Sequence, residues 1–404
     1  MSLNHGRDLT AMPGPSMIPD RVLRAMHRAA PDIYGEPLIG MTATVMSDLK
    51  RLAGTAGAVA VYIGNGHAVW EASVANLFTP GERVLVLSTG RFGLSWAETA
   101  RRMGIAVEVM DFGFRAAADP ARLEARLRAD REGAPLKAVL TVQTDTASGV
   151  RNDVAALRAA IDAAGHPALF AVDCIASLGC EPFEMDALGV DVMLGACQKG
   201  LMTPPGVAFT FHGARAEAAR IPCQSPYWDW GPRTAPEEYY QQFCGTAPTH
   251  HLFGLREALD MLLEEEGLGN AWRRHGVFAR AIWAAVETWG GALELNIADP
   301  RQRSHAVTTI RTAPGLATRV RAWCAESAGL TLGVGLCGPD QDRDSLFRIG
   351  HMGHLNPPTM LGALATIEAA LEALGAPRGA GALEAAAGVV ARAGDSLPKS
   401  PDAG

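Results

Sequence analysis

Lysine is scarce in this chain, whose 36 basic residues include only Lys50, Lys137, Lys199 and Lys399. The basic residues form no block and the net charge is −7, so nucleic acid is not an expected partner. No run of about 18 apolar residues is present, which argues against a membrane span. The seven cysteines are an odd number without a CxxC pair, a pattern that favours reduced thiols over a disulfide framework or a zinc site.

The amino-terminal sequence has no basic stretch leading into an apolar one, so it does not look like a secretory signal, and we expect a cytoplasmic protein. Of the 404 residues, 48% are hydrophobic and 20% are charged, which excludes a disordered or collagen-like chain. This length is enough for roughly two or three domains.

Between residues 40 and 215, short β-branched apolar runs alternate with longer periodic stretches rich in Ala, Leu and Arg. This alternation predicts βαβ units around a parallel sheet. We expect strands at 58–63, 83–88, 106–110, 138–143, 168–173, 191–194 and 207–211. We expect helices at 41–52, 68–77, 93–102, 120–131 and 153–164, the last of them capped by Asn152.

The second half of the chain begins with an aperiodic segment, 222–248, which we interpret as a long functional loop. An amphipathic stretch at 252–289, broken near 266–269, predicts a helix that links two domains. Beyond it we expect strands at 306–310 and 346–349 and helices at 316–327 and 358–374. The predicted division is an N-terminal segment 1–20 that reaches the active site, a large domain 21–255, a linking helix region 256–289, a small domain 290–380, and a tail 381–404 whose last ten residues are expected to be disordered.

Lys199 follows the apolar strand sequence DVML and lies among glycines and prolines in GACQKGLMTPPG. Because α/β sheets bind ligands at the carboxyl ends of their strands, this position suits an amine that forms a Schiff base. The alternative is an ordinary surface lysine in a turn.

A second apolar strand ends in Asp173, about 26 residues before Lys199. A pyridoxal phosphate enzyme needs an anion beside the ring nitrogen, so that the protonated ring can accept electrons. The same aspartate is also compatible with the N-cap of a following helix.

Two further segments suit anion binding. The turn GNGH, residues 64–67, lies between a strand and a helix, where backbone N–H groups and the helix dipole favour a phosphate. Val69 stands where the dinucleotide fingerprint needs its third glycine, which disfavours a nicotinamide cofactor. Arg348, in FRIGHMG, can bind a carboxylate bidentately, although a simple salt bridge is an alternative.

Taken together, these segments resemble the fold-type I aminotransferases of class V, particularly the alanine:glyoxylate and serine:glyoxylate group. From residue 11 to 375 the motifs follow the family order MPGPSMIPDRVLRAM, GNGHAVWEA, TPGERVLVLSTGRFG, DTASGV, VDCIASLG, GACQKGLMTPPG, TAPTHHLFGLREAL and FRIGHMG. The resemblance implies an α/β fold with a large, mostly parallel seven-stranded sheet and a smaller C-terminal α+β domain. It also implies pyridoxal 5′-phosphate as cofactor, and ping-pong transfer of the amino group of a small amino acid to glyoxylate or pyruvate.

The same resemblance assigns roles to individual residues. Lys199 would bind the cofactor covalently and then move the proton between Cα and C4′, while Asp173 would pair with the ring nitrogen. The other implied cofactor contacts are Asn65, Gly66, His67 and Gln198 at the phosphate, Phe92 and Ile175 on the ring, and Thr146 near the 3′ oxygen. Thr246 would reach the phosphate of the neighbouring subunit, which implies a homodimer with shared active sites. At the substrate, the implied residues are Arg348 on the α-carboxylate, Gly14 and Tyr34.

The sequence departs from the family in two places. Phe243 stands where many relatives have a tyrosine at the phosphate site, so we expect looser or rearranged phosphate binding. Residues 32–35 read DIYG where several serine:glyoxylate enzymes read DHRS, which leaves the amino donor open. The alternatives are pyridoxamine with pyruvate, and aspartate or ureidoglycine with glyoxylate.

Other functions are compatible with the same fold. A cysteine desulfurase would use a residue such as Cys337, but those enzymes usually have a histidine where this chain has Gln198. A non-catalytic protein is disfavoured by the intact lysine, aspartate and arginine. We expect no metal at His67, His351 or His354, since no third ligand has suitable spacing.

Overall fold

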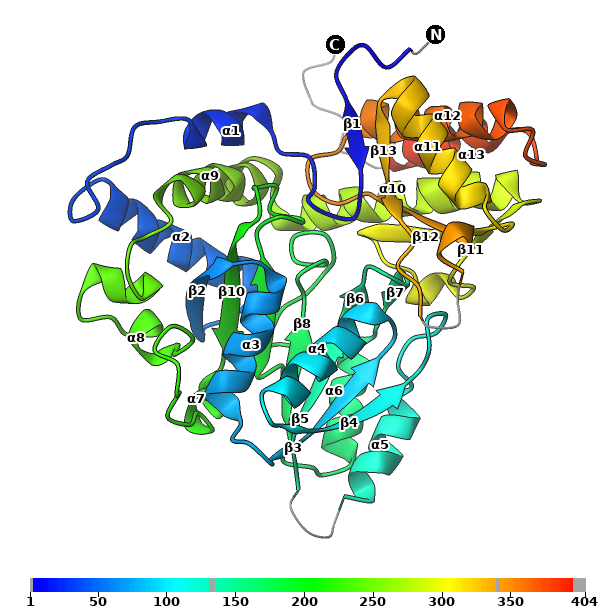
Figure 1. The fold of residues 1–404 in the computed structure, drawn as a ribbon. Coiled ribbons are helices and arrows are strands. Elements are labelled where there is room, and N and C mark those ends of the chain that lie inside the picture. Colours follow the sequence, from blue (N-terminus) through cyan, green and yellow to red (C-terminus); the bar gives the residue numbers. More distant parts are fainter. Residues whose placement is uncertain (1–2, 131–134, 339–341, 395–404) are drawn as a thin grey trace.

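The computed structural model describes residues 3–130, 135–338 and 342–394, which form two main sheets flanked by helices and one two-stranded sheet (Figure 1). The large sheet has seven strands in the order β2 (Ala58–Gly64), β10 (Gly206–His212), β9 (Val192–Ala196), β8 (Leu169–Asp173), β5 (Leu136–Val142), β3 (Arg83–Ser88) and β4 (Ala106–Asp111). Strand β10 is antiparallel to both of its neighbours, and the other adjacent pairs are parallel. The predicted fold class, with its mostly parallel seven-stranded sheet, is confirmed.

Both faces of the large sheet are buried, as the near-continuous apolar runs predicted. In β3, Leu85 and Leu87 belong to one core cluster, whereas Val84 and Val86 belong to another on the opposite face. Helices α3 (Gly66–Leu77) and α4 (Arg91–Arg102) supply residues to the second cluster. The first cluster receives residues from α2 (Leu38–Ala53), α5 (Pro120–Arg128), α6 (Val154–Ala163) and α9 (Thr249–Leu259).

The predicted cap of α6 is wrong by one residue. The side chain of Asp153, not Asn152, accepts the hydrogen bond from the Ala156 amide at 3.0 Å. Asn152 is buried, and its carboxamide donates to Thr89 Oγ1 and to the carbonyl of Val142. Buried Asn152 therefore links Thr89 to Val142, while exposed Asp153 caps the helix. Helix α5 ends at Arg128, and residue 131, its predicted end, lies outside the described residues.

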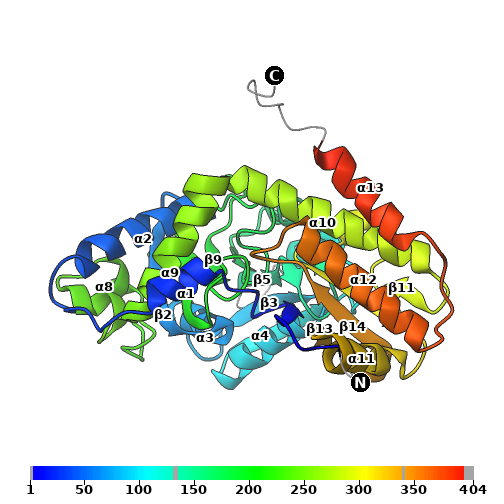
Figure 2. The ribbon, with the colours of Figure 1, turned by 90° about the horizontal axis from the view of Figure 1, so that it is seen from above.

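The segment 222–248 is mostly irregular and contains only the short helices α8 (Gly231–Thr234) and η1 (Tyr239–Phe243), after α7 (Ala214–Ala218). Helix α9 then continues through a π-helical segment, η2 (Asp260–Glu266), into α10 (Leu268–Trp289). Gly267, with φ at +79°, separates the last two, which confirms the predicted interruption. Seen from above, α10 runs from the large sheet to the small one (Figure 2). None of the described helices is both long enough and apolar enough to cross a membrane.

The small sheet has the order β1 (Leu9–Ala11), β13 (Leu330–Val334), β14 (Leu346–Gly350), β12 (Val307–Thr312) and β11 (Leu293–Leu295). It shares a separate core with α10, α11 (Leu316–Ala328), α12 (Pro357–Ala373) and α13 (Ala382–Gly394). The sequence predicted β12, β14, α11 and α12 but missed the other three strands and α13, which lies in the predicted tail. Residues 395–404, expected to be disordered, lie outside the described residues. The remaining elements are α1 (Asp20–Met26), β6 (Thr144–Asp145), β7 (Val150–Arg151), η3 (Pro300–Gln302) and η4 (Arg343–Ser345).

Strand β1 brings the N-terminal segment into the small sheet, where Leu9, Thr10 and Ala11 pair in parallel with residues 330–332 of β13. The chain then leaves this sheet and crosses to the end of β9 in the large sheet, where the Ser16 amide donates to the carbonyl of Gln198 at 3.0 Å. The first twenty residues therefore contact both sheets.

The separate core of the small sheet can be tested with two leucines on helices. Leu371 of α12 is fully buried in that core, whereas Leu23 of α1 is 46% exposed. We expect Leu371→Ala to lower the free energy of unfolding by about 2–5 kcal/mol because it leaves a cavity. The matched control Leu23→Ala should change it by no more than about 0.5 kcal/mol. Equal effects of the two substitutions in chemical denaturation would contradict the assigned core.

Candidate active site

A cavity of about 270 Å³ opens at the carboxyl edge of the large sheet. It lies where β2, β3, β5, β8 and β9 end, the edge at which α/β sheets bind ligands. The residues that line it are Gly14, Pro15, Asn65, Gly66, His67, Trp70, Phe92, Val142, Thr144, Thr146, Asp173, Ile175, Ala176, Gln198, Lys199 and Pro205. All predicted site residues are in this group except Arg348, Tyr34 and Thr246.

Lys199, one of the lining residues, makes two hydrogen bonds to the N-terminal segment. Its amine donates a hydrogen bond to the carbonyl of Pro13, and the Ser16 hydroxyl donates to the Lys199 carbonyl at 2.6 Å. Gly14, with φ at +92°, lies so close to the lysine side chain that a Cβ there would collide with it. Burial, and then the nearby charge of Arg348, lower the pKa of Lys199 to about 8, although Asp173 acts in the opposite direction. A neutral, nucleophilic amine is therefore accessible near neutral pH.

Asp173 ends β8 and is almost fully buried. Its Oδ1 accepts a hydrogen bond from the Ile175 amide at 2.7 Å, and its Oδ2 accepts one from the indole N–H of Trp70, also at 2.7 Å. Burial raises the pKa of Asp173 to about 6, while these two donors favour the ionised form. The carboxyl is thus an anion at neutral pH, held by α3 and by its own turn.

Trp70 is the main residue of the cavity that the sequence analysis missed. It belongs to the GNGHAVWEA segment, but no role was assigned to it there. One signal was present in the sequence: Trp70 lies in the predicted helix 68–77, only four residues after Gly66 of the predicted anion-binding turn, and in α3 residues at that spacing share one helix face. Gly66 and Trp70 lie on one face of α3, and both line the cavity.

The turn after β2 forms the N-terminus of α3. Asn65 caps this helix, with its side-chain oxygen accepting from the His67 amide at 3.0 Å. A Cβ at Gly66 would come within 2.5 Å of Ile175 Cδ1, so the Ile175 side chain would have to shift to admit one. The positive end of the helix dipole lies beside the cavity. Gln198 also lines the cavity, and its Oε1 atom is buried without a hydrogen-bond partner in the described part of the chain.

Arg348 of β14 lies behind the wall of the cavity. Its Nη1 donates to the carbonyl of Thr146 at 2.8 Å and its Nε donates to the carbonyl of Val334 at 2.7 Å. Burial lowers the pKa of Arg348 to about 10, which leaves the guanidinium charged at neutral pH. The structure thus brings this arginine from the small sheet to a residue that lines the cavity.

Besides Arg348, two predicted residues do not line the cavity of this chain. Tyr34 is 80% exposed, and Thr246 is also on the surface. Phe243, which replaces the family tyrosine, is buried in the large core and packs edge-on against Tyr239 with ring centroids 5.7 Å apart. Cys337 does not line the cavity. His351 is buried, and its Nε2 is hydrogen-bonded to Thr308 Oγ1 at 2.9 Å.

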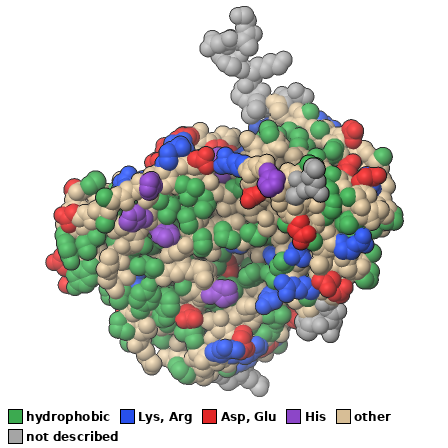
Figure 3. Space-filling model, turned by 45° about the horizontal axis from the view of Figure 1, so that its top comes forward, with side chains coloured by type: hydrophobic (Ala, Val, Ile, Leu, Met, Phe, Trp, Pro, Cys, Tyr) green, Lys and Arg blue, Asp and Glu red, His purple; other side chains and the backbone are tan. Residues whose placement is uncertain are grey.

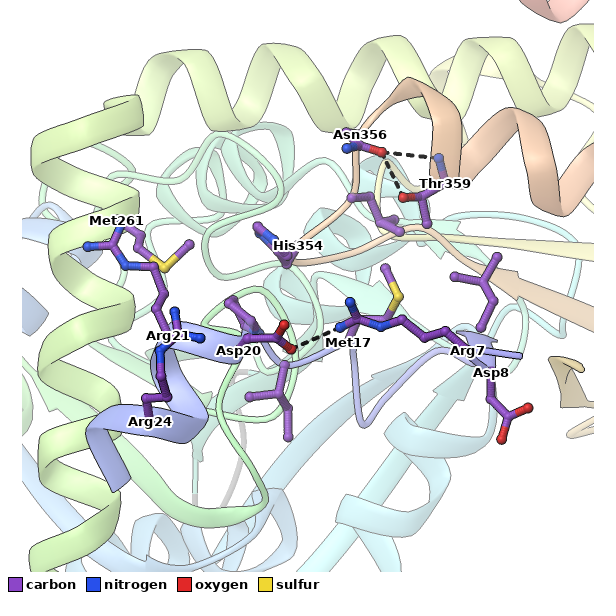
Figure 4. Close-up of a pocket in the computed structure, with 14 residues that line it drawn as sticks. Arg7, Asp8, Met17, Asp20, Arg21, Arg24, Met261, His354, Asn356 and Thr359 are labelled. Atoms are coloured by element: carbon purple, nitrogen blue, oxygen red, sulfur yellow. Dashed lines mark hydrogen bonds and ion pairs between the residues drawn. The ribbon is translucent and has the colours of Figure 1, made fainter. Parts of the chain in front are cut away.

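A larger cavity, of about 620 Å³, lies along the N-terminal segment between β1 and α1 (Figure 4). Its charged side chains largely neutralise one another or pair with neighbours. Arg7 pairs with Asp20 at 2.9 Å, and Arg21 pairs with Glu265 at 2.7 Å. None of the described residues that line it is a lysine, whereas Lys199 lines the smaller cavity.

The two-sheet architecture and the buried lysine and aspartate at the carboxyl edge are those of a fold-type I enzyme. The family model described as aminotransferase class-V matches residues 11–337, and the chain therefore belongs to the class-V aminotransferases.

Individual relatives cover nearly the whole chain. The serine–glyoxylate aminotransferase of Methylorubrum extorquens is 36% identical over 91% of this chain and 91% of its own length. The L-aspartate–glyoxylate aminotransferase of Paracoccus denitrificans is 33% identical, with 91% of each chain covered. Among solved structures, ureidoglycine–glyoxylate aminotransferase of Bacillus subtilis superimposes with a TM-score of 0.86 at 27% identity and covers 97% of this chain and 100% of that one.

The lowered pKa of Lys199 can be measured directly. In competitive labelling of the protein with acetic anhydride, followed by mass spectrometry, the Lys199 peptide should be half-reactive near pH 8. Arg348→Gln should move this midpoint to higher pH, because it removes a cation that disfavours the protonated amine. A midpoint near the ordinary lysine value of 10.5 in both proteins would contradict the assigned environment.

Proposed function

We propose that this chain is a pyridoxal 5′-phosphate-dependent aminotransferase that moves the amino group of a small amino acid to glyoxylate or pyruvate. The observation that carries the proposal is the presence of the Lys199 amine and the Asp173 carboxylate in one buried cavity beside the N-terminus of α3. The serine–glyoxylate relative, at 36% identity, supports the choice of substrates.

The residues of the cavity fit this cofactor. An anionic phosphate suits the helix N-terminus at Gly66 and His67, and Gln198, which lines the same cavity, can donate a further hydrogen bond from its Nε2 group. Asn65 would shape this turn, and Thr146 would lie near the 3′ oxygen. An aromatic ring suits the space between Phe92 and Ile175, and Asp173 offers an anion for its nitrogen.

When bound, the cofactor supplies an electron sink for the negative charge left on the substrate Cα after proton removal. The chain contributes the groups that move and hold protons. The Lys199 amine would take the proton from the substrate Cα and deliver it to C4′ of the cofactor, for which a pKa near 8 is well matched. Asp173, as an anion, keeps a proton on the ring nitrogen.

Selection of a small, uncharged side chain follows from the charges at the site. Arg348 would bind the α-carboxylate, and Gly14 would leave room for it. Arg348 reaches the cavity wall through the Thr146 carbonyl and is assigned to the α-carboxylate, and Lys199 is the one Lys or Arg among the described residues that line the cavity of about 270 Å³. The second carboxylate of aspartate would therefore find no further guanidinium among those residues, which favours serine or alanine as donor.

A second copy of the chain would complete the site. Thr246 and Tyr34 lie outside the cavity of their own subunit, where a partner could reach them. The exposed large hydrophobic residues include Leu23, Tyr34, Ile63 and Tyr240, and green side chains gather on the left of the face in Figure 3. Such patches are typical of protein interfaces. We therefore propose a homodimer, and cytoplasmic location stays a prediction from the sequence.

The proposed reaction is tested with a panel of amino donors, each paired with glyoxylate or pyruvate. We expect serine or alanine with glyoxylate to give the highest kcat/KM and aspartate to be poor. Lys199→Ala should be inactive with every pair, since Lys199 is the one lysine among the described residues that line the cavity. Turnover with pyridoxamine as the only accepted amino donor would contradict the assigned substrates. Release of sulfide from cysteine would contradict them as well.

The role of Arg348 is tested by Arg348→Lys. Lysine keeps the charge but cannot bind a carboxylate bidentately, so we expect KM for the amino acid to rise about tenfold or more. Affinity for pyridoxal phosphate should stay near the wild-type value. A normal KM would show that another group binds the α-carboxylate.

A further inference from the structure

We propose that Trp70 is a positioning residue, whose indole N–H fixes the Asp173 carboxylate as an anion facing the cavity. No role of Trp70 follows from the sequence motifs. The inference rests on the proposed function, because it assumes that Asp173 pairs with the ring nitrogen of the cofactor.

The hydrogen bond joins two elements that are far apart in sequence. Trp70, on α3, is 1% exposed, and its Nε1 donates to Asp173 Oδ2 at 2.7 Å across 103 positions of the chain. The other carboxylate oxygen, Oδ1, accepts from the Ile175 amide at 2.7 Å. Each oxygen thus receives one N–H donor, and neither donor can turn away without breaking a buried hydrogen bond.

Aromatic neighbours hold the indole in place. Trp96 of α4 stacks on Trp70, with ring centroids 6.4 Å apart and planes 13° apart. The His67 ring lies 4.4 Å away on the same helix, and Phe92 lies 6.4 Å away. The direction of the N–H is therefore set by packing, and the carboxylate is held against it.

The electrostatic consequence can be followed from the charges around Asp173. Burial and the nearby Asp145 carboxylate raise the pKa of Asp173, whereas the Ile175 amide, the Trp70 indole and the Lys199 amine favour the anion. Other titratable groups nearby are His67, which lines the cavity, Cys174, whose thiol is affected by the Asp173 charge, and Arg348 behind Thr146. Without the indole donor, the carboxyl would be protonated up to a higher pH. A protonated carboxyl cannot neutralise the positive ring nitrogen, so cofactor binding would weaken.

Trp96 provides a matched control. It is fully buried and stacks on Trp70, but its Nε1 has no hydrogen-bond partner within the described ranges. Trp70→Phe and Trp96→Phe therefore remove the same atoms from the same aromatic stack. Only the first removes a donor to the carboxylate.

The experiment measures the affinity of the apoprotein for pyridoxal 5′-phosphate from pH 5.5 to 9, by titration of cofactor absorbance. At pH 7 we expect Trp70→Phe to bind about tenfold more weakly than wild type, the loss that follows from one hydrogen bond to a charged group. The loss should shrink toward pH 9, so that the acid limb of the affinity profile moves to higher pH. Trp96→Phe should follow the wild-type profile at every pH.

Two further proteins separate positioning from a general loss of structure. Benzothienylalanine at position 70 keeps the shape of the indole but has sulfur in place of N–H, so it should reproduce the shifted profile even if the phenylalanine variant is unstable. In an Asp173→Asn background, Trp70→Phe should cause no further loss of affinity, because the group it acts on is gone.

Coincident profiles for wild type and the benzothienylalanine protein would overturn the inference, as would additive losses in the double variant. A wild-type protein that does not bind pyridoxal 5′-phosphate at any pH would instead overturn the proposed function, and the inference with it.

Discussion

Burial of the Lys199 amine and the Asp173 carboxylate in one cavity moves both pKa values toward neutrality, to about 8 and about 6. Neither ion has enough water around it to remain charged as readily as in solution, and each partly compensates for the other. The chemistry proposed for the site depends on this balance. The amine must be neutral for part of the time, and the carboxylate must stay ionised while the amine titrates.

The two sheets contribute different groups to the surroundings of Lys199 and Asp173. Strands β8 and β9 of the large sheet end side by side, which places Asp173 near Lys199 without any long-range adjustment of the chain. The small sheet contributes from the other side. Its strand β1 leads to Pro13, whose carbonyl accepts from the lysine, and β14 carries Arg348 to the carbonyl of Thr146. The surroundings of the amine are therefore built by residues that lie far apart in the sequence.

Much of this arrangement could be predicted from the sequence. The strands of the large sheet were predictable because their apolar runs are buried on both faces, and Asp173 and Lys199 because each follows such a run. The three-residue strands β1 and β11 could not be predicted, since so short a segment has no measurable periodicity. The hydrogen bond from Trp70 to Asp173 was not predictable either, because it depends on how α3 packs against the large sheet. Tyr34 and Thr246 do not reach the cavity of their own chain, and their proposed roles depend on a second subunit.

The most direct test of the account is to identify the residue that holds the cofactor. The protein would be incubated with pyridoxal 5′-phosphate, reduced with borohydride, digested and analysed by mass spectrometry. With only four lysines in the chain, each can be followed separately. The account predicts one reduced adduct, on Lys199. An adduct confined to another lysine, or none on any lysine, would contradict it.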